Sequence, residues 1–297
     1  SQNLYGTTSA GGLTNCNGGC GTVFLTDPNG SGYRVLYQFT GTVHTADGAD
    51  PVAGLVFDSQ SNLWGTAQKG GSKNLGTVFE LGAPAYTTLK FAHSFRGTPN
   101  GAFPAAGLTF NSRVGGVLGT LYGTTSAGGN RVCSGGCGLV FQLEISSGVF
   151  SNIYKLTGTG KSATGSSPVG KLALDTSNDP RAGHLYGTAA LGGISGGACP
   201  VAGCGTLFEV CPPTISCSGY SRGAVVFQFN GTAGANPLAG MLLDLPGADG
   251  LLFGREAMDG RSGDGPLTGK GACPTNCVGS NANGGTSGKG TIVKIKP

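Results

Sequence analysis

A leucine, an aromatic residue and a glycine follow one another at five places in this chain, and this repetition most constrains its fold. The copies begin at Leu4, Leu63, Leu121, Leu185 and Leu252, with intervals of 59, 58, 64 and 67 residues. A repeat of nearly fixed period indicates units that bury their apolar faces against their neighbours. No linker separates the units, so we expect one domain. Its repeats cover approximately residues 1–50, 51–103, 104–167, 168–236 and 237–297.

The composition favours strands over helices. Glycine contributes 59 of the 297 residues, and charged residues are only 11%, against about 25% in an average soluble protein. Glycine disfavours helices, and glycine-rich turns between short apolar stretches are typical of strands. The hydrophobic content of 38% argues against disorder.

The second repeat contains four expected strands, named a to d in chain order. They cover residues 51–58, 62–66, 76–81 and 91–95. Four short antiparallel strands per unit are typical of a propeller blade. Strand a is expected to begin at a proline, whose missing N–H is tolerated at the first residue of a strand. The prolines concerned are Pro51, Pro104, Pro168 and Pro237.

We therefore predict an all-β, β-propeller-like ring of five four-stranded repeat units, with the first and last units incomplete. The first repeat lacks strand a and the last lacks strand d, which leaves 18 strands. Three explanations stay open: the closing unit is short, an upstream segment is absent, or another chain supplies a strand.

The ten cysteines form five short-range pairs, and four of these pairs occupy the same loop of their repeats. The second repeat has a shorter loop there and no cysteine, so each pair is expected to staple a long loop. Five pairs indicate disulfides and an oxidising compartment. Zinc is the alternative reading of this spacing, but we expect no metal and no cofactor. The pairs are Cys16/Cys20, Cys133/Cys137, Cys199/Cys204, Cys211/Cys217 and Cys273/Cys277.

Charge and hydropathy exclude some partners. The net charge is +4, from 18 basic and 14 acidic residues, without a basic cluster, so we expect no nucleic-acid partner. No stretch of 18 apolar residues exists, so no membrane span is expected. The chain has no initiating methionine or signal peptide, as in a processed or truncated chain. A weakly charged surface favours self-association or attachment to cell-surface partners.

Two phrases recur in fixed order and resemble a known family. Residues 4–12 and 121–129 both read Leu-Tyr-Gly-Thr-Thr-Ser-Ala-Gly-Gly, and each is followed by a strand that begins at Gly21 or Gly138. This pattern is similar to the bacterial Gloeo/Verruco ("GloVer") tandem repeat across essentially the whole chain. The resemblance implies an exported, often surface-anchored repeat protein. It brings no catalytic residues. This chain shows no C-terminal sorting signal, which the family pattern would include.

Residues that break the repeat pattern are the better candidates for a functional site. The fifth repeat departs most, with the densest charge in the chain. This cluster is read either as a polar ligand pocket or as a salt-bridged contact patch, and we assign no catalytic residue. The candidates are Arg255, Glu256, Asp259, Arg261 and Asp264.

The histidines and the acidic residues of the turns are given structural roles. His93 occupies an aromatic slot of strand d and is expected to pack, whereas His184 is expected in a turn. The loop with His44, Asp47 and Asp50 is read as a turn, with a metal site as the alternative. The residues that end strand a are expected to cap their own turns. They are Asp58, Asn111, Asp175 and Asp244.

Two functions remain open at this point. The first is a non-enzymatic structural or adhesive module, secreted or on the cell surface, that assembles into a filament or surface layer. The second is a carbohydrate-binding lectin or glycan-active enzyme, with a site at one end of the propeller. Paired carboxylates facing each other would favour glycoside hydrolysis, but the four glutamates and ten aspartates mostly occupy repeat-equivalent positions.

Overall fold

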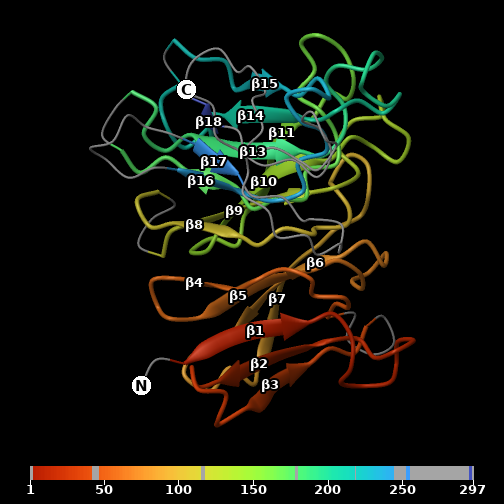
Figure 1. Cartoon of the computed structure of the whole chain (residues 1–297). Coiled ribbons are helices and arrows are strands. Elements are labelled where there is room, and N and C mark those ends of the chain that lie inside the picture. Colours follow the sequence, from red (N-terminus) through yellow and green to blue (C-terminus); the bar gives the residue numbers. More distant parts are fainter. Residues whose placement is uncertain are drawn as a thin grey trace. The chain divides into compact units, whose positions relative to one another are not determined.

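A computed structural model describes residues 3–41, 47–114, 118–177, 180–217, 219–243, 252–254 and 294–295. Every regular element in these ranges is a β-strand, and none is a helix (Figure 1). The chain divides into two compact units, and the division falls inside the strand that covers residues 150–155. Unit 1 contains residues 1–129 and 139–152, and unit 2 contains residues 130–138 and 153–297. Organisation as one domain stays a prediction.

The strands form five antiparallel sheets, and within each sheet the strands are neighbours in chain order. The first sheet consists of β1 (Leu4–Thr8), β2 (Thr22–Thr26) and β3 (Arg34–Gln38). The second consists of β4 (Val56–Phe57), β5 (Leu63–Ala67), β6 (Thr77–Leu81) and β7 (Leu89–Ser94). The third consists of β8 (Thr109–Asn111), β9 (Thr120–Thr125), β10 (Leu139–Glu144) and β11 (Phe150–Lys155).

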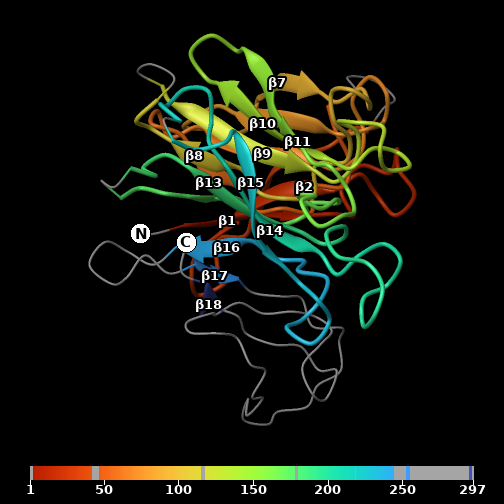
Figure 2. The ribbon, with the colours of Figure 1, turned by 90° about the horizontal axis from the view of Figure 1, so that it is seen from above.

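Unit 2 continues the series. The fourth sheet consists of β12 (Ala173–Leu174), β13 (Leu185–Ala189), β14 (Thr206–Val210) and β15 (Gly223–Gln228). The fifth consists of β16 (Met241–Leu243), β17 (Leu252–Gly254) and β18 (Lys294–Ile295). Within this unit β16 contacts β12 and β13, so the fifth sheet packs against the fourth (Figure 2).

The strand plan agrees with the sequence prediction. The described residues contain 18 strands, and the sheets are four-stranded except for the first and the last. In the first sheet the b-type strand β1 is an edge strand. In the last sheet the c-type strand β18 is an edge strand among the described residues. Closure of the five sheets into a ring stays a prediction.

Register explains the glycine of the repeated phrase. Gly6, Gly65 and Gly123 each lie opposite a phenylalanine of the neighbouring strand. A methyl group built on these glycines would lie 2.4–2.5 Å from the Cζ atom of that ring. The glycine is therefore required by space, because the ring lies directly over it. Gly187 and Phe208 repeat the arrangement in the fourth sheet.

The leucine and the aromatic residue of the phrase serve opposite faces of a sheet, because side chains alternate along a strand. Leu63 packs in a core with residues of the first sheet. Trp64, its neighbour, packs in a core with Leu121 and Phe141 of the third sheet. The second sheet is therefore covered on both faces, as the repeat predicted.

The prediction for the start of strand a was wrong. The strand begins at Val56 and not at Pro51, and the other a-type strands also begin about five residues after their proline. Pro51 instead packs its Cδ against Gly21 of the preceding repeat. The residue before each of these prolines has a positive φ, which turns the chain away from the extended conformation that strand a needs. These residues are Asp50, Phe103, Ser167 and Asn236, with φ of 54–58°.

Candidate functional site

Four of the five predicted disulfides lie in the described residues, and all four are formed. They join Cys16 to Cys20, Cys133 to Cys137, Cys199 to Cys204 and Cys211 to Cys217. Cys273 and Cys277 lie outside the described residues, so their pairing stays a prediction. The described residues contain no free cysteine.

Two of the loop disulfides pack against the glycine that follows strand d. A methyl group on Gly41 would lie 2.8 Å from the sulfur of Cys16, and one on Gly158 would lie 3.0 Å from the sulfur of Cys133. In the second repeat, which has no cysteine, the equivalent Gly97 faces Leu75 at 3.3 Å. A leucine thus fills the space that a disulfide fills elsewhere, which fits the prediction that each pair staples a longer loop.

His93 packs as predicted. Its ring stacks on Phe150 with the centroids 3.5 Å apart, and it meets Phe95 edge-on. Burial and, to a smaller extent, the nearby positive charge of Arg96 together lower the pKa of His93 to about 4. His93 is therefore a neutral packing residue at neutral pH.

Asp47 and Asp50 serve the loop itself. Asp47 is buried and accepts hydrogen bonds from the Tyr37 hydroxyl at 2.5 Å and from the backbone and hydroxyl of Thr40. Asp50 pairs with Lys69 at 2.7 Å. Both carboxylates have structural partners, which supports the turn reading. His44 lies outside the described residues.

The residues that end strand a cap their turns as predicted. Asp58 Oδ1 accepts from the backbone N–H of Gln60 at 2.8 Å, and Asn111 and Asp175 accept from the N–H two residues on in the same way. Asp58 Oδ2 also accepts from the indole N–H of Trp64 at 2.9 Å. Asp244 lies outside the described residues.

Around Glu209 the structure brings together charged side chains that the sequence did not single out. Glu209 extends from β14, and its Oε1 accepts from His184 Nδ1 at 2.6 Å and from the Tyr186 hydroxyl at 3.2 Å. Arg181 Nε lies 3.5 Å from the same oxygen. Burial, followed by the negative charge of Glu209, raises the pKa of Tyr186, so its hydroxyl stays a donor. We call these four residues the Glu209 cluster.

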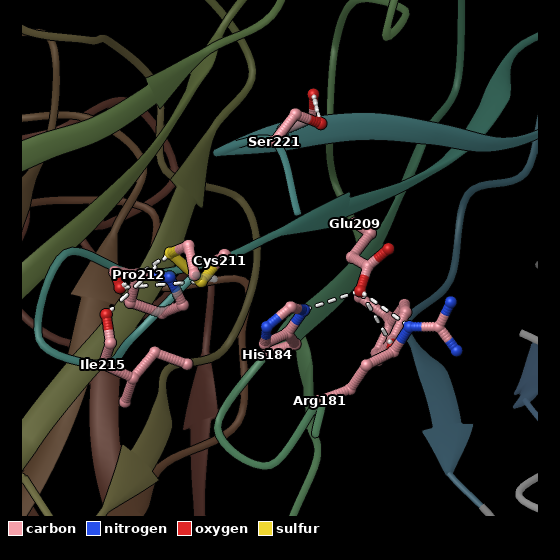
Figure 3. The surroundings of a disulfide bond; sticks show 10 residues. Arg181, His184, Glu209, Cys211, Pro212, Ile215 and Ser221 are labelled. Carbon is pink, nitrogen blue, oxygen red and sulfur yellow. Dashed lines mark hydrogen bonds and ion pairs between the residues drawn. A yellow bond between two sulfur atoms is a disulfide. The ribbon is translucent and has the colours of Figure 1, made fainter. Parts of the chain in front are cut away.

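His184 is the most deeply buried member of the Glu209 cluster, with no exposed surface. A carboxylate can only accept hydrogen bonds, so Nδ1 carries the proton that binds Glu209. Nε2 is buried without a hydrogen-bond partner and points away from Glu209 (Figure 3). His184 does lie at a turn, where its N–H bonds the carbonyl of Arg181, but the turn prediction missed the buried ring.

A disulfide-closed loop lies beside the Glu209 cluster. Cys211 and Cys217 join the ends of the loop between β14 and β15, unlike the other three pairs, which precede a c-type strand. Ile215 of this loop lies within 3.2 Å of where a Gly183 side chain would begin, and Tyr220 meets the His184 ring edge-on. Figure 3 shows His184 between Glu209 and this loop. The loop therefore shields the cluster from solvent.

Comparison among repeats separates the Glu209 cluster from its equivalents. Glu80 occupies the position of Glu209 in the second repeat and pairs with Lys90, a lysine with 68% of its side chain exposed. The third repeat has the uncharged Gln142 there. Among these three equivalent positions, only Glu209 has three charged or ionisable partners. The sequence contains one signal for this cluster, because position 184 is a histidine where other repeats have asparagine or threonine.

The Glu209 cluster has the chemistry of a buried structural network. Glu209 Oε1 accepts two hydrogen bonds, from His184 and Tyr186, and forms an ion pair with Arg181. The described residues contain no group of three or more histidine, cysteine or acidic side chains that could hold a metal ion. Arg255, Glu256, Asp259, Arg261 and Asp264 all lie outside the described residues, so a site in the fifth repeat stays a prediction.

Among the described residues of unit 1, no other sheet covers the outer face of the first sheet, and we call this face the open face. It carries Leu4, Phe24, Tyr33 and Val35; Phe24 and Val35 are cross-strand partners, and Phe24 and Tyr33 are in ring contact. Leu4 is 52% exposed, Val35 40% and Tyr33 58%. The leucines equivalent to Leu4 are at most 1% exposed. These are Leu63, Leu121 and Leu185.

Among the residues that the structure describes, no helix is long and apolar enough to cross a membrane.

These features define an all-β tandem-repeat protein with disulfide-stapled loops. The chain belongs to the Gloeobacter/Verrucomicrobia repeat family, whose model matches residues 1–198, which confirms the resemblance seen in the sequence. The family and the disulfides are consistent with an extracellular location. No curated protein matches the chain significantly.

Solved structures with distant similarity include three of different kinds. The GH74 enzyme of Niastella koreensis is 18% identical over 75% of this chain and 28% of its own, with a TM-score of 0.45. A putative 6-phosphogluconolactonase from Bacteroides fragilis is 13% identical over 84% of this chain and 60% of its own, with a TM-score of 0.46. A chain of a nidogen/laminin complex is 11% identical over 84% and 69%, with a TM-score of 0.45. TM-scores below 0.5 support no conclusion about activity.

Proposed function

We propose that this protein is an extracellular, non-enzymatic structural repeat protein that self-associates through the open face of its first sheet. The observation that carries the proposal is the exposure of Leu4, set against the burial of the equivalent leucine in three other repeats. The same side chain is part of a core wherever a neighbouring sheet covers it. A sheet that provides the same contact would bury the open face in the same way.

The occupant proposed for the open face is the last sheet of a second copy. In the second repeat the equivalent face, which carries Leu63, packs against the preceding sheet. The last sheet of a second copy would take the place of such a preceding sheet on the open face. Head-to-tail contacts of this kind form a ring if they close and a filament if they do not. Adhesion to a surface would follow from such assembly.

Light scattering across a hundredfold range of protein concentration tests this proposal. We expect the apparent mass to rise with concentration, and Leu4→Asp to abolish the rise because a carboxylate would enter the buried contact. Leu13→Asp is the matched control, since Leu13 is 40% exposed in a loop of the same repeat. A wild-type mass that stays at one monomer throughout, or equal effects of both variants, would contradict the proposal.

Binding or hydrolysis of glycans stays a prediction attached to the fifth repeat, because the charged residues on which it rests lie outside the described residues. Loss of glycan binding on Glu256→Gln would support it.

A further inference from the structure

Strand β15 is an edge strand with an open groove beside it. It is the last strand of the fourth sheet, so in the described part of the chain one of its sides has no strand partner. All six of its residues are half-buried. The groove has a volume of about 590 Å³ and is lined by residues 224–228 of β15 and by Lys161 and Ser162.

The main chain supplies most of the hydrogen-bonding groups that β15 offers to the groove. The first four lining residues of the strand are Ala224, Val225, Val226 and Phe227, whose side chains contain no polar atom. In an antiparallel sheet an edge strand directs alternate N–H and C=O pairs away from the sheet. The groove therefore offers backbone donors and acceptors beside a few apolar side chains, and a bulge at Val226 divides this row of backbone groups in two.

The far wall of the groove is held in place. Gln228 Nε2 donates to the carbonyls of Gly160 and Lys161 at 3.0 and 2.9 Å, which ties the loop to the end of β15. Gly160 N–H also bonds the carbonyl of Gly193 at 2.8 Å. A wall that is already ordered lowers the entropy cost of binding.

Lys161 gives the groove its charge. It is the one charged residue in the lining, and its side chain is exposed. A partner with a carboxylate near Lys161 is therefore favoured over a basic partner. A sugar fits less well, because the lining has no exposed aromatic face: Phe227 packs against the core of unit 2.

We propose that the β15 groove binds an extended, acidic peptide segment that adds to the fourth sheet as a fifth strand. Main-chain hydrogen bonds to β15 supply the affinity, as in other cases of strand addition. A carboxylate of the peptide lies at Lys161 and sets its direction. This surface is separate from the open face of the first sheet, so the two proposals stand or fall independently.

Fluorescence anisotropy with a labelled peptide of sequence Thr-Val-Thr-Val-Thr-Val-Asp tests the proposal. We expect saturable binding, together with slower amide hydrogen exchange in residues 224–228. Lys161→Glu should weaken binding about tenfold at low salt, as loss and reversal of one charge contact predicts. Lys73→Glu, which changes an exposed lysine in another repeat, should leave the affinity unchanged.

A second peptide separates strand addition from attraction of charge. The same sequence with N-methyl groups at alternate residues keeps the side chains and the carboxylate but loses ladder donors, so it should not bind. Equal binding of both peptides would overturn the proposal. So would absence of binding up to about 1 mM peptide, the weak end of measured affinities, or protection from exchange away from β15.

Discussion

Residues at equivalent positions of different repeats have different roles in this protein because their neighbours differ. Glu80 and Glu209 occupy equivalent positions in their strands, yet Glu80 meets one exposed lysine while Glu209 meets His184, Tyr186 and Arg181. A buried carboxylate with several donors is costly to disturb, because removing one member leaves the others buried without partners. Glu80 is as buried as Glu209, with 12% and 13% of the side chain exposed, but its one ionic partner, Lys90, is 68% exposed and adds less.

Replacing Glu209 by alanine should therefore destabilise the protein by about 3 kcal/mol, the range for breaking a buried charged pair. Glu80→Ala is the matched control and should cost less, because Glu80 is equally buried but pairs with a single, largely exposed lysine. Chemical denaturation monitored by tryptophan fluorescence measures both values. Similar losses for the two variants would show that the Glu209 cluster contributes nothing beyond a pair with one exposed lysine.

His93 makes stability depend on pH. Its pKa is lowered to about 4 by burial first and by Arg96 second, whereas the unfolded chain has a histidine pKa near 6.5. Between these values the unfolded state binds more protons than the folded state, so stability falls as pH decreases from about 6.5 to 4.

The variant His93→Phe should remove this part of the pH dependence, since phenylalanine occupies the equivalent slot at Phe227. Melting temperatures at pH 7 and pH 4.5 measure it. The wild type should lose more stability than the variant, by an amount on the order of 1–2 kcal/mol. Equal losses would show that the ring is not held neutral by the fold.

At the scale of the element, the unit of construction is a pair of strands in which a phenylalanine ring covers a glycine. Gly123 and Phe141 form such a pair between β9 and β10. The backbone of Gly123 does not have a positive φ in this structure, so the constraint on it is space alone. This explains why the third residue of the repeated phrase is glycine in the first four copies.

Gly123→Ala should therefore destabilise the protein by roughly 1–3 kcal/mol, the typical range for an overpacked core. Gly82→Ala is the control, because a methyl group there meets nothing within 4 Å and Gly82 has no positive φ. Denaturant midpoints compare the two. A neutral effect of Gly123→Ala would mean that the Phe141 ring moves aside without cost.

For the whole molecule, the main consequence of the repeats is that each sheet depends on its neighbours. Leu63 and Trp64 contribute to cores on opposite faces of one sheet, so unfolding of that sheet would expose both adjacent sheets. Two compact units are nevertheless distinguished by their contacts. Neighbour coupling predicts that they unfold together.

Differential scanning calorimetry should thus show one transition, with the calorimetric and van't Hoff enthalpies equal within error. A variant that disturbs unit 1, such as Gly123→Ala, should shift the entire transition. Two separable transitions, with only one moved by this variant, would contradict the prediction of a single domain.

The sequence by itself determined the all-β class, the number and order of the strands, the four described disulfides and the family, because these depend on local patterns that the repeat displays several times. It also indicated the packing of His93, whose slot is aromatic in other repeats. Only the tertiary structure determined the contacts between residues that are distant in the chain. Glu209 lies 25 residues from His184, and no local pattern brings a β14 carboxylate to that ring. The late start of strand a and the exposure of Leu4 also depend on contacts between repeats. The proline before strand a packs against the preceding repeat, and the leucine of the phrase is buried where a neighbouring sheet covers it.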